Sequence, residues 1–200
     1  MTTLVLVRHG QTDWNRERRI QGLTDIPLNE TGRQQALDAA GRLRGRSWDG
    51  VITSPLSRAR DTALIISEQL SLPAPVSVAE ISERNFGEGE GLTGEEVLER
   101  FPDGVLIPGR ETRAQVAARV TPALAELAAS RPGQSLIVVT HGGVIGTMLR
   151  YVSGGALPLP GELITNGSVH EFGFRDGQLV LVRGEEVHGP RDPVSASLMG

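Results

Sequence analysis

Short apolar runs along the chain predict the strands of a buried sheet. They occupy residues 3–7, 51–53 and 135–140 and are rich in valine, isoleucine and leucine. Runs that are apolar throughout, rather than at every second position, are typical of parallel strands covered on both faces. A shorter strand is expected near residues 76–78, after Pro73 and Pro75 interrupt the chain.

Segments with helical periodicity separate these runs. Residues 31–46 and 112–129 each carry one apolar stripe. The stripe positions are Ala36, Leu37, Ala40 and Leu43 in the first segment and Val116, Val120, Leu124 and Leu127 in the second. Ser54 and Pro55 predict the cap and first turn of a helix that runs to about residue 70. A further helix is expected from about residue 142 to 152.

Two other segments have a different character. Glycine is dense between residues 83 and 110, and only residues 95–100 have a helical pattern there, which makes this segment the best candidate for a lid. Residues 169–174 and 179–182 flank Asp176-Gly177, a sequence that favours a tight hairpin turn.

The order of these elements predicts the fold class. Strands that alternate with helices indicate an α/β fold, and 200 residues suit one core. We therefore expect a single domain over residues 1–200, with a lid insertion at about 83–111. In open sheets of this class, ligands bind beyond the carboxyl ends of the strands.

The composition excludes several classes of protein. Hydrophobic residues make up 38% of the chain and charged residues 22%, which is ordinary for a globular protein. No apolar run approaches a membrane span and no secretory leader opens the chain, so we expect a cytoplasmic protein without a membrane partner. The net charge of −4 argues against nucleic acid as a partner, because a phosphate-tracking surface needs a basic stripe.

The chain has no cysteine and no lysine. The first absence excludes a thiolate nucleophile and a cysteine-based metal site. The second excludes a P-loop lysine and a Schiff base. Any phosphoryl chemistry would therefore depend on arginine, histidine, backbone N–H groups or a metal.

Two histidines occupy equivalent positions. His9 and His141 each follow an apolar strand and each precede a glycine. One such histidine alone is more often a partly buried side chain with a satisfied hydrogen bond. Two of them at neighbouring strand ends would point into one crevice. A metal site is the weaker interpretation, because neither histidine belongs to a cluster with ligand spacing.

Two arginines accompany the histidines. Arg8 directly precedes His9, and Arg58 lies one turn into the helix expected after the second strand. The arginine fork matches two phosphate oxygens, so this arrangement fits phosphate recognition. Taken alone, Arg58 would be interpreted as a surface residue like its neighbour Arg60.

Several segments in order carry a resemblance to a known family. They are residues 6–15 (LVRHGQTDWN), 19–22 (RIQG), 25–32 (DIPLNETG), 54–63 (SPLSRARDTA), 81–91 (ISERNFGEGEG), 139–142 (VTHG) and 166–168 (NGS). Together they resemble the motifs of the histidine phosphatase superfamily, the phosphoglycerate-mutase-like proteins. The resemblance implies a three-layer α/β/α fold with a mostly parallel central sheet, and hydrolysis of a phosphomonoester without metal or cofactor.

The resemblance also implies roles for individual residues. His9 would be the nucleophile that becomes phosphohistidine, with one ring nitrogen held by a backbone carbonyl. Arg8, Arg58 and His141 would surround the phosphoryl oxygens. The expected substrate-binding residues are Asn15, Gln21, Gly22, Gly142 and Arg84.

Glu83 would be the acid that protonates the leaving oxygen and then the base that activates water. Its rivals are Glu80, Glu88 and Glu90, and only the position in the family-like segment favours Glu83. The assignment predicts activity best at acidic to neutral pH.

Two alternatives remain at this point. In the mutases of the family the acid-bearing run is Glu-Arg-His-Tyr-Gly; here residues 83–87 are ERNFG and the following insertion is short, which favours a phosphatase. A non-catalytic phospho-ligand binding module would be expected to lack the nucleophile or the acid. The chain departs from the family at residues 109–112 (GRET, where phosphatases have Gly-Glu-Ser) and at Gly89, which replaces a tryptophan. Both departures lie in the lid.

The substrate is less defined than the reaction. The outer-pocket candidates are compatible with sugar phosphates, phosphoglycerate-like acids or a ribazole phosphate. Arg84 would read a substrate carboxylate or support the acid-bearing loop, with equal weight. The sequence leaves open whether the protein is a monomer or a homodimer, although the C-terminal hairpin offers an edge strand.

Overall fold

A mixed six-stranded sheet forms the centre of the computed structural model, which describes residues 1–184. The expected domain thus ends outside the described residues. The strands are β1 (Thr2–Arg8), β2 (Gly50–Thr53), β3 (Val76–Ser77), β4 (Ser135–Thr140), β5 (Val169–Arg175) and β6 (Gln178–Gly184). Their order in the sheet is β3-β2-β4-β1-β5-β6. The strands β3, β2, β4 and β1 pair in parallel, whereas β5 pairs antiparallel with β1 and β6 pairs antiparallel with β5.

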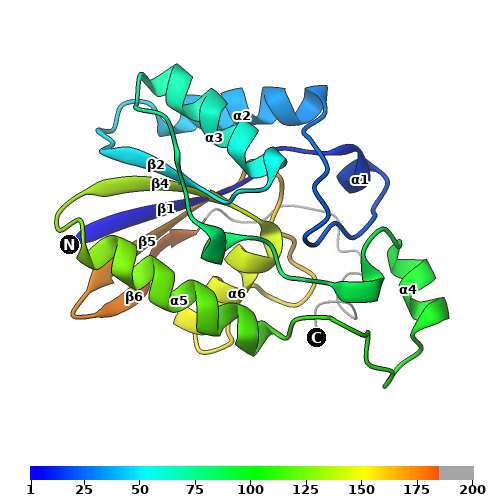
Figure 1. Ribbon diagram of the computed structural model, residues 1–200. Helices are drawn as coiled ribbons and strands as arrows, with labels where there is room; N and C mark the ends of the chain where they lie inside the picture. The colour runs from blue at the N-terminus through cyan, green and yellow to red at the C-terminus, as the bar shows by residue number, and fades with distance from the viewer. Residues whose placement is uncertain (185–200) are drawn as a thin grey trace.

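Helices cover both faces of this sheet, as Figure 1 shows. On one face lie α2 (Glu30–Leu43) and α3 (Ser57–Leu70), and on the other lie α5 (Arg113–Ala129) and α6 (Gly142–Val152). Successive β1 side chains alternate between the two layers: Val5 packs in the cluster with α2 and α3, and Leu4 packs in the cluster with α5 and α6. The predicted α/β/α architecture is confirmed.

The strand register brings three strand ends to one edge of the sheet. Arg8 pairs with Thr140 across β1 and β4, so His9 and His141 leave adjacent parallel strands at the same level. Thr53 pairs with Val139, which places Ser54 at the end of β2 next to them.

The start of α3 differs from the prediction. The helix begins at Ser57 rather than at Ser54-Pro55, and its N-cap Leu56 provides no side-chain hydrogen bond. Instead, Oδ1 of Asp25 accepts bonds from the backbone N–H of Ser57 (2.8 Å) and from its hydroxyl (2.7 Å). A distant carboxylate therefore caps this helix, and Ser54 is left for another contact.

The remaining helical elements agree in part with the sequence. Leu37 is 39% exposed and does not belong to the buried stripe of α2, where Ala39 takes part instead. The one-turn helix α1 (Asp13–Arg16) was not predicted, although Thr12 and Asn15 form its capping box. No helix within residues 1–184 has the length and apolar character needed to cross a membrane.

The segment after β3 is largely irregular. It contains η1 (Ala79–Ile81), η2 (Gly87–Gly89) and the predicted short helix α4 (Gly94–Arg100), and Figure 1 shows α4 away from the sheet. The predicted hairpin of β5 and β6 is confirmed. Asp176 and Gly177 form its turn with φ values of 51° and 79°, which suit the tight turns that join two strands.

Candidate active site

The ends of β1 and β4 bring the two histidines together. The ring centroids of His9 and His141 are 5.1 Å apart with an interplanar angle of 62°. Both side chains are buried. The structure thus places the two imidazoles in the shared position that their strands imply.

The backbone fixes the tautomer of His9. Its Nδ1 lies 2.7 Å from the carbonyl oxygen of Gly10, which can only accept, so Nδ1 carries the proton and Nε2 keeps its lone pair. Burial, and then the charges of Arg8 and Arg58, hold the pKa of His9 well below its usual value; the Gly10 bond opposes them. The ring is therefore neutral at pH 7, as a nucleophile must be.

His141 is held by a residue that the sequence assigned differently. Its Nε2 lies 2.8 Å from Oγ of Ser54, the residue expected to cap α3. Burial is the largest cause that lowers the pKa of His141 well below its usual value, followed by the charge of Arg58.

Arg8 and Arg58 supply buried positive charge beside the imidazoles. Arg58 is fully buried and donates to the carbonyl oxygens of Gly22 (2.7 Å) and Thr24 (2.9 Å). Nη1 of Arg8 donates to the carbonyl oxygen of Ile164. Burial lowers the pKa of Arg8 to about 10 and is also the largest cause that lowers the pKa of Arg58, with the charge of Glu83 opposing it in both. Arginine side chains in proteins keep their positive charge at neutral pH.

Three buried nitrogen atoms around His9 have no hydrogen-bond partner within the described part of the chain. They are Nε of Arg8, Nε of Arg58 and Nδ1 of His141. A buried donor without an acceptor is costly, and native structures rarely keep several together outside functional sites. This arrangement fits a site built to receive an anion with several oxygens.

Glu83 lines the same pocket from the irregular segment after β3. Its Oε1 accepts from the N–H of Arg84 (2.8 Å) and its Oε2 accepts from the N–H of Gly143 (3.1 Å). The rival carboxylates are used elsewhere or exposed. Glu90 binds the N–H groups of Leu23 and Thr24, each at 2.9 Å.

Glu88 pairs with Arg100 at 2.6 Å on the surface, and Glu80 is exposed. Neither residue lines the pocket, so Glu83 is the one of the four candidate acids that does. The geometry separates carboxylates that the sequence could not.

The pocket has a volume of about 240 Å³ and includes all the predicted substrate-binding residues. These are Asn15, Gln21, Gly22, Arg84 and Gly142, and they lie with Arg8, His9, Arg58 and Glu83. Oε1 of Gln21 is buried without a hydrogen-bond partner among residues 1–184. Nε of Arg84 donates to the carbonyl oxygen of Glu111 at 2.6 Å, so Arg84 both lines the pocket and contacts the following loop.

Sequence reasoning missed several contributors. Arg113 and Glu162 line the outer pocket, and Ser54 holds His141. Nδ2 of Asn166 donates to the carbonyl oxygen of His9 at 3.0 Å, a contact that the family-like triplet at residues 166–168 does not reveal by itself. Within residues 1–184 no group of three or more histidine, cysteine or carboxylate side chains is placed to hold a metal ion.

Comparisons with known proteins agree with this geometry. The model of the histidine phosphatase superfamily (branch 1) matches residues 4–186. The chain is 39% identical over 176 residues to the uncharacterized phosphatase PhoE of Bacillus subtilis, covering 88% of this chain and 90% of that one. It is 36% identical over 193 residues to a metal-independent phosphoserine phosphatase of Arabidopsis thaliana, covering 90% and 80% of the two chains.

A solved structure extends the agreement to three dimensions. The mycobacterial glucosyl-3-phosphoglycerate phosphatase in complex with VO3 superposes with a TM-score of 0.78 at 32% identity. The match covers 90% of this chain and 97% of that one. On sequence and structure together, the chain is a phosphatase that belongs to the histidine phosphatase superfamily.

Proposed function

We propose that the protein hydrolyses a small phosphomonoester through a phosphohistidine formed on His9. The observation that carries this proposal is the free lone pair on Nε2 of a neutral His9, surrounded by buried cationic and unpaired nitrogen donors. A neutral imidazole of this tautomer is a competent nucleophile, and the surrounding donors suit a phosphoryl group.

In the first step, Nε2 of His9 attacks phosphorus in line with the leaving oxygen. The new N–P bond forms as the P–O bond breaks, and protonated Glu83 gives its proton to the leaving alcohol. In the second step, Glu83 takes a proton from water, the water oxygen attacks phosphorus, and the N–P bond breaks. Inorganic phosphate leaves and Glu83 is protonated again.

The other site residues would stabilise the charge on the transferring group. Arg8, Arg58 and His141 would donate to the phosphoryl oxygens, and the N–H of Gly142 at the start of α6 would add another donor. Asn15 would donate through Nδ2, because its Oδ1 already accepts from Thr12 and Asn166.

For the substrate, we propose a compact metabolite with a second anionic group. The pocket of about 240 Å³ suits a small molecule, and Arg84 and Arg113 line it together with the catalytic groups, Gln21 and Gly22. Two relatives are named for substrates that carry a carboxylate, phosphoserine and glucosyl-3-phosphoglycerate. Arg84 would then contact the carboxylate.

The same proposal covers the setting of the reaction. We expect the chain to act as one domain in the cytoplasm, with residues 83–111 as a lid and without a metal or cofactor. The relative named as metal-independent supports the last point.

A single experiment tests the reaction. The protein is incubated with phenyl phosphate in EDTA, quenched in alkali during turnover, and digested for mass spectrometry. We expect undiminished turnover and an acid-labile phosphoryl group on the peptide that contains His9. Full loss of activity in EDTA, or a phosphoryl group on another residue, would contradict the proposal.

A second arm separates water from a sugar-acid acceptor. The protein is given bisphosphoglycerate and monophosphoglycerate, and the products are followed by phosphorus NMR. We expect inorganic phosphate to be released, whereas a mutase would exchange phosphoryl groups between the two acids. A panel of phosphorylated metabolites with and without a carboxylate then tests the substrate class.

A further inference from the structure

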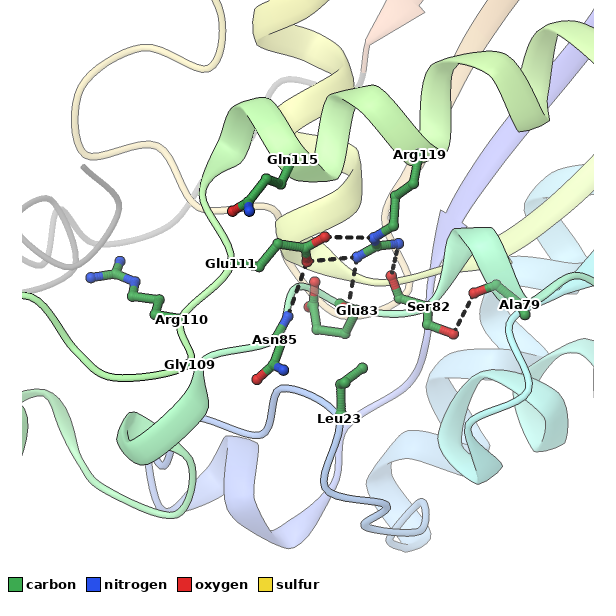
Figure 2. Close-up of a pocket in the computed structure, with 10 residues that line it drawn as sticks. All are labelled: Leu23, Ala79, Ser82, Glu83, Asn85, Gly109, Arg110, Glu111, Gln115 and Arg119. Atoms are coloured by element: carbon green, nitrogen blue, oxygen red, sulfur yellow. Dashed lines mark hydrogen bonds and ion pairs between the residues drawn. The ribbon is translucent and has the colours of Figure 1, made fainter.

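An arginine–glutamate pair lies against the segment that carries Glu83. Figure 2 shows Arg119 of α5 and Glu111 of the preceding loop against the chain that carries Glu83. Glu111 accepts two bonds from the guanidinium of Arg119, at 2.8 Å and 2.9 Å. We call this pair the Glu111–Arg119 clamp.

Arg119 holds the backbone on both sides of the acid. Its Nη1 donates to the carbonyl oxygens of Glu80 and Ser82, the latter at 2.9 Å, and its Nη2 donates to that of Glu83 at 3.0 Å. Three carbonyl oxygens of residues 80–83 thus converge on one guanidinium. This geometry requires the planar, multi-donor group of arginine.

Glu111 holds the chain that follows the acid. Its Oε2 accepts from the N–H of Asn85 at 3.2 Å, and its own N–H donates to the Asn85 carbonyl oxygen at 2.8 Å. Its carbonyl oxygen accepts from Arg84 at 2.6 Å. Residues 80–85 are therefore bonded to the clamp before and after Glu83.

No helix or strand of its own holds this segment in place. Residues 82–86 belong to no helix or strand, and a hollow of about 610 Å³ adjoins them, lined by Glu83, Asn85 and both clamp residues. Other bonds hold single points of the segment: the Thr140 hydroxyl donates to the Ile81 carbonyl oxygen (2.7 Å) at its start, and the N–H of Phe86 donates to Oε1 of Glu90 (3.1 Å) at its end. The N–H of Gly143 donates to the Glu83 carboxylate itself (3.1 Å), but the backbone on both sides of Glu83 is bonded to the clamp. Burial alone would raise the pKa of Glu111, but the hydrogen bond and charge of Arg119 lower it, so the clamp is ionised at neutral pH.

We propose that Arg119 and Glu111 are positioning residues that hold the Glu83 carboxyl group where it can protonate the leaving oxygen. The inference rests on the proposed role of Glu83 as the acid. A displacement of an acid by about 1 Å can cost about 100-fold in rate, so loss of the clamp acts on the same step as loss of the acid itself.

Leaving-group dependence tests this inference. A phenolate leaves poorly without a proton, whereas 2,4-dinitrophenolate leaves without one. The value compared is kcat/KM, which reports steps up to P–O cleavage. We expect Arg119→Gln to lower kcat/KM for phenyl phosphate about 10- to 100-fold. For 2,4-dinitrophenyl phosphate it should lie within about threefold of wild type.

Three further variants make the result decisive. Glu83→Gln should show the same selectivity with a larger loss, and Glu83→Gln with Arg119→Gln should be no worse than Glu83→Gln alone. Glu111→Gln, which keeps the Arg119–carbonyl bonds, should show the selectivity more weakly. Arg100→Gln, which breaks the exposed Glu88–Arg100 pair, is the matched control and should leave both substrates unchanged.

Each outcome is informative. Equal losses on both substrates, no loss, or additive losses in the double variant would overturn the clamp's positioning role. If Glu83→Gln itself lacked leaving-group selectivity, the assignment of the acid would fail instead. Circular dichroism of each variant shows whether it is folded before its rates are compared.

Discussion

The histidine side of the site is held by the sheet, whereas the acid side is held by side chains. Arg8, His9 and His141 stand at the ends of strands whose register is set by a continuous parallel ladder. Glu83 stands on an irregular segment that is bonded mainly through the Glu111–Arg119 clamp.

The two kinds of support match the two chemical roles proposed for these residues. Nucleophile and phosphate-binding groups must meet one tetrahedral anion in every substrate, so a rigid strand-end arrangement suits them. The acid must reach an oxygen whose surroundings change with the leaving alcohol. Because side chains rather than the sheet support the segment that carries Glu83, its position can change without any change in the strands.

Removal of the nucleophile should have the largest effect and should affect all substrates alike. We expect His9→Ala to lower kcat by about 10⁴-fold or more, because the variant lacks the nitrogen proposed to form the covalent intermediate. Steady-state rates with phenyl and 2,4-dinitrophenyl phosphate check this. His170→Asn, at a buried histidine of β5, is the control and should keep near-normal rates. Retained turnover in His9→Ala would exclude His9 as the nucleophile.

A smaller loss is expected where phosphate binding depends on the fork of Arg58. Lysine keeps the charge but cannot bond both Gly22 and Thr24 while facing the phosphoryl group. We expect Arg58→Lys to lower kcat/KM by about 10²- to 10³-fold on both aryl phosphates. The control is Arg60→Lys on the same helix. The side chain of Arg60 is 57% exposed, so this variant should have the kcat/KM of wild type. Loss on phenyl phosphate alone would place Arg58 with the acid side instead.

The strand-end side could be predicted from the sequence because its signals are local. The apolar runs before His9 and His141 define two buried strands, and a parallel sheet puts their ends together. The position of Arg8 in the site could also be predicted, because Arg8 directly precedes His9 in the sequence. The helix at residues 113–129 also follows from its local apolar stripe.

The acid side could not be predicted, because its contacts join distant residues. Arg119 meets Glu83 across 36 positions of the chain, and nothing near Arg119 in sequence distinguishes it from other helix arginines. The predicted start of α3 was wrong for the same reason, because Asp25 caps the helix from 32 residues away. Ser54 therefore meets His141 rather than serving as the cap.

A small substitution on α6 should disturb only the acid. A Cβ on Gly143 would lie 2.4 Å from Oε1 of Glu83, so Gly143→Ala must displace the carboxylate. We expect kcat/KM for phenyl phosphate to fall about tenfold, with little change for the dinitrophenyl ester. Gly41→Ala, where no atom lies within 4 Å of the added Cβ, is the control. Equal losses on both esters would mean that the substitution disturbs the whole site.

The smallest effect concerns stability, and it should belong to the strand-end side. Burial, and then neighbouring arginine charge, hold the pKa of both His9 and His141 well below 6.5. In the unfolded chain the same rings have pKa values near 6.5, so below that pH the unfolded chain binds more protons than the folded one. Stability is therefore full above about pH 6.5 and falls as the pH drops.

Comparison with a variant shows how much of the pH dependence of the free energy of unfolding comes from His141. A histidine that stays neutral in the folded protein contributes a loss of stability of about 1 kcal/mol between pH 6.5 and 5.5, because its unfolded form is only half protonated at pH 6.5. Between pH 6.5 and 5.5, the free energy of unfolding from urea titrations should therefore fall by about 1 kcal/mol less in His141→Asn than in wild type. Carboxylates titrate equally in both proteins and cancel in the difference. Identical losses would show that His141 accepts a proton in the folded protein, which would conflict with its place between His9 and Arg58.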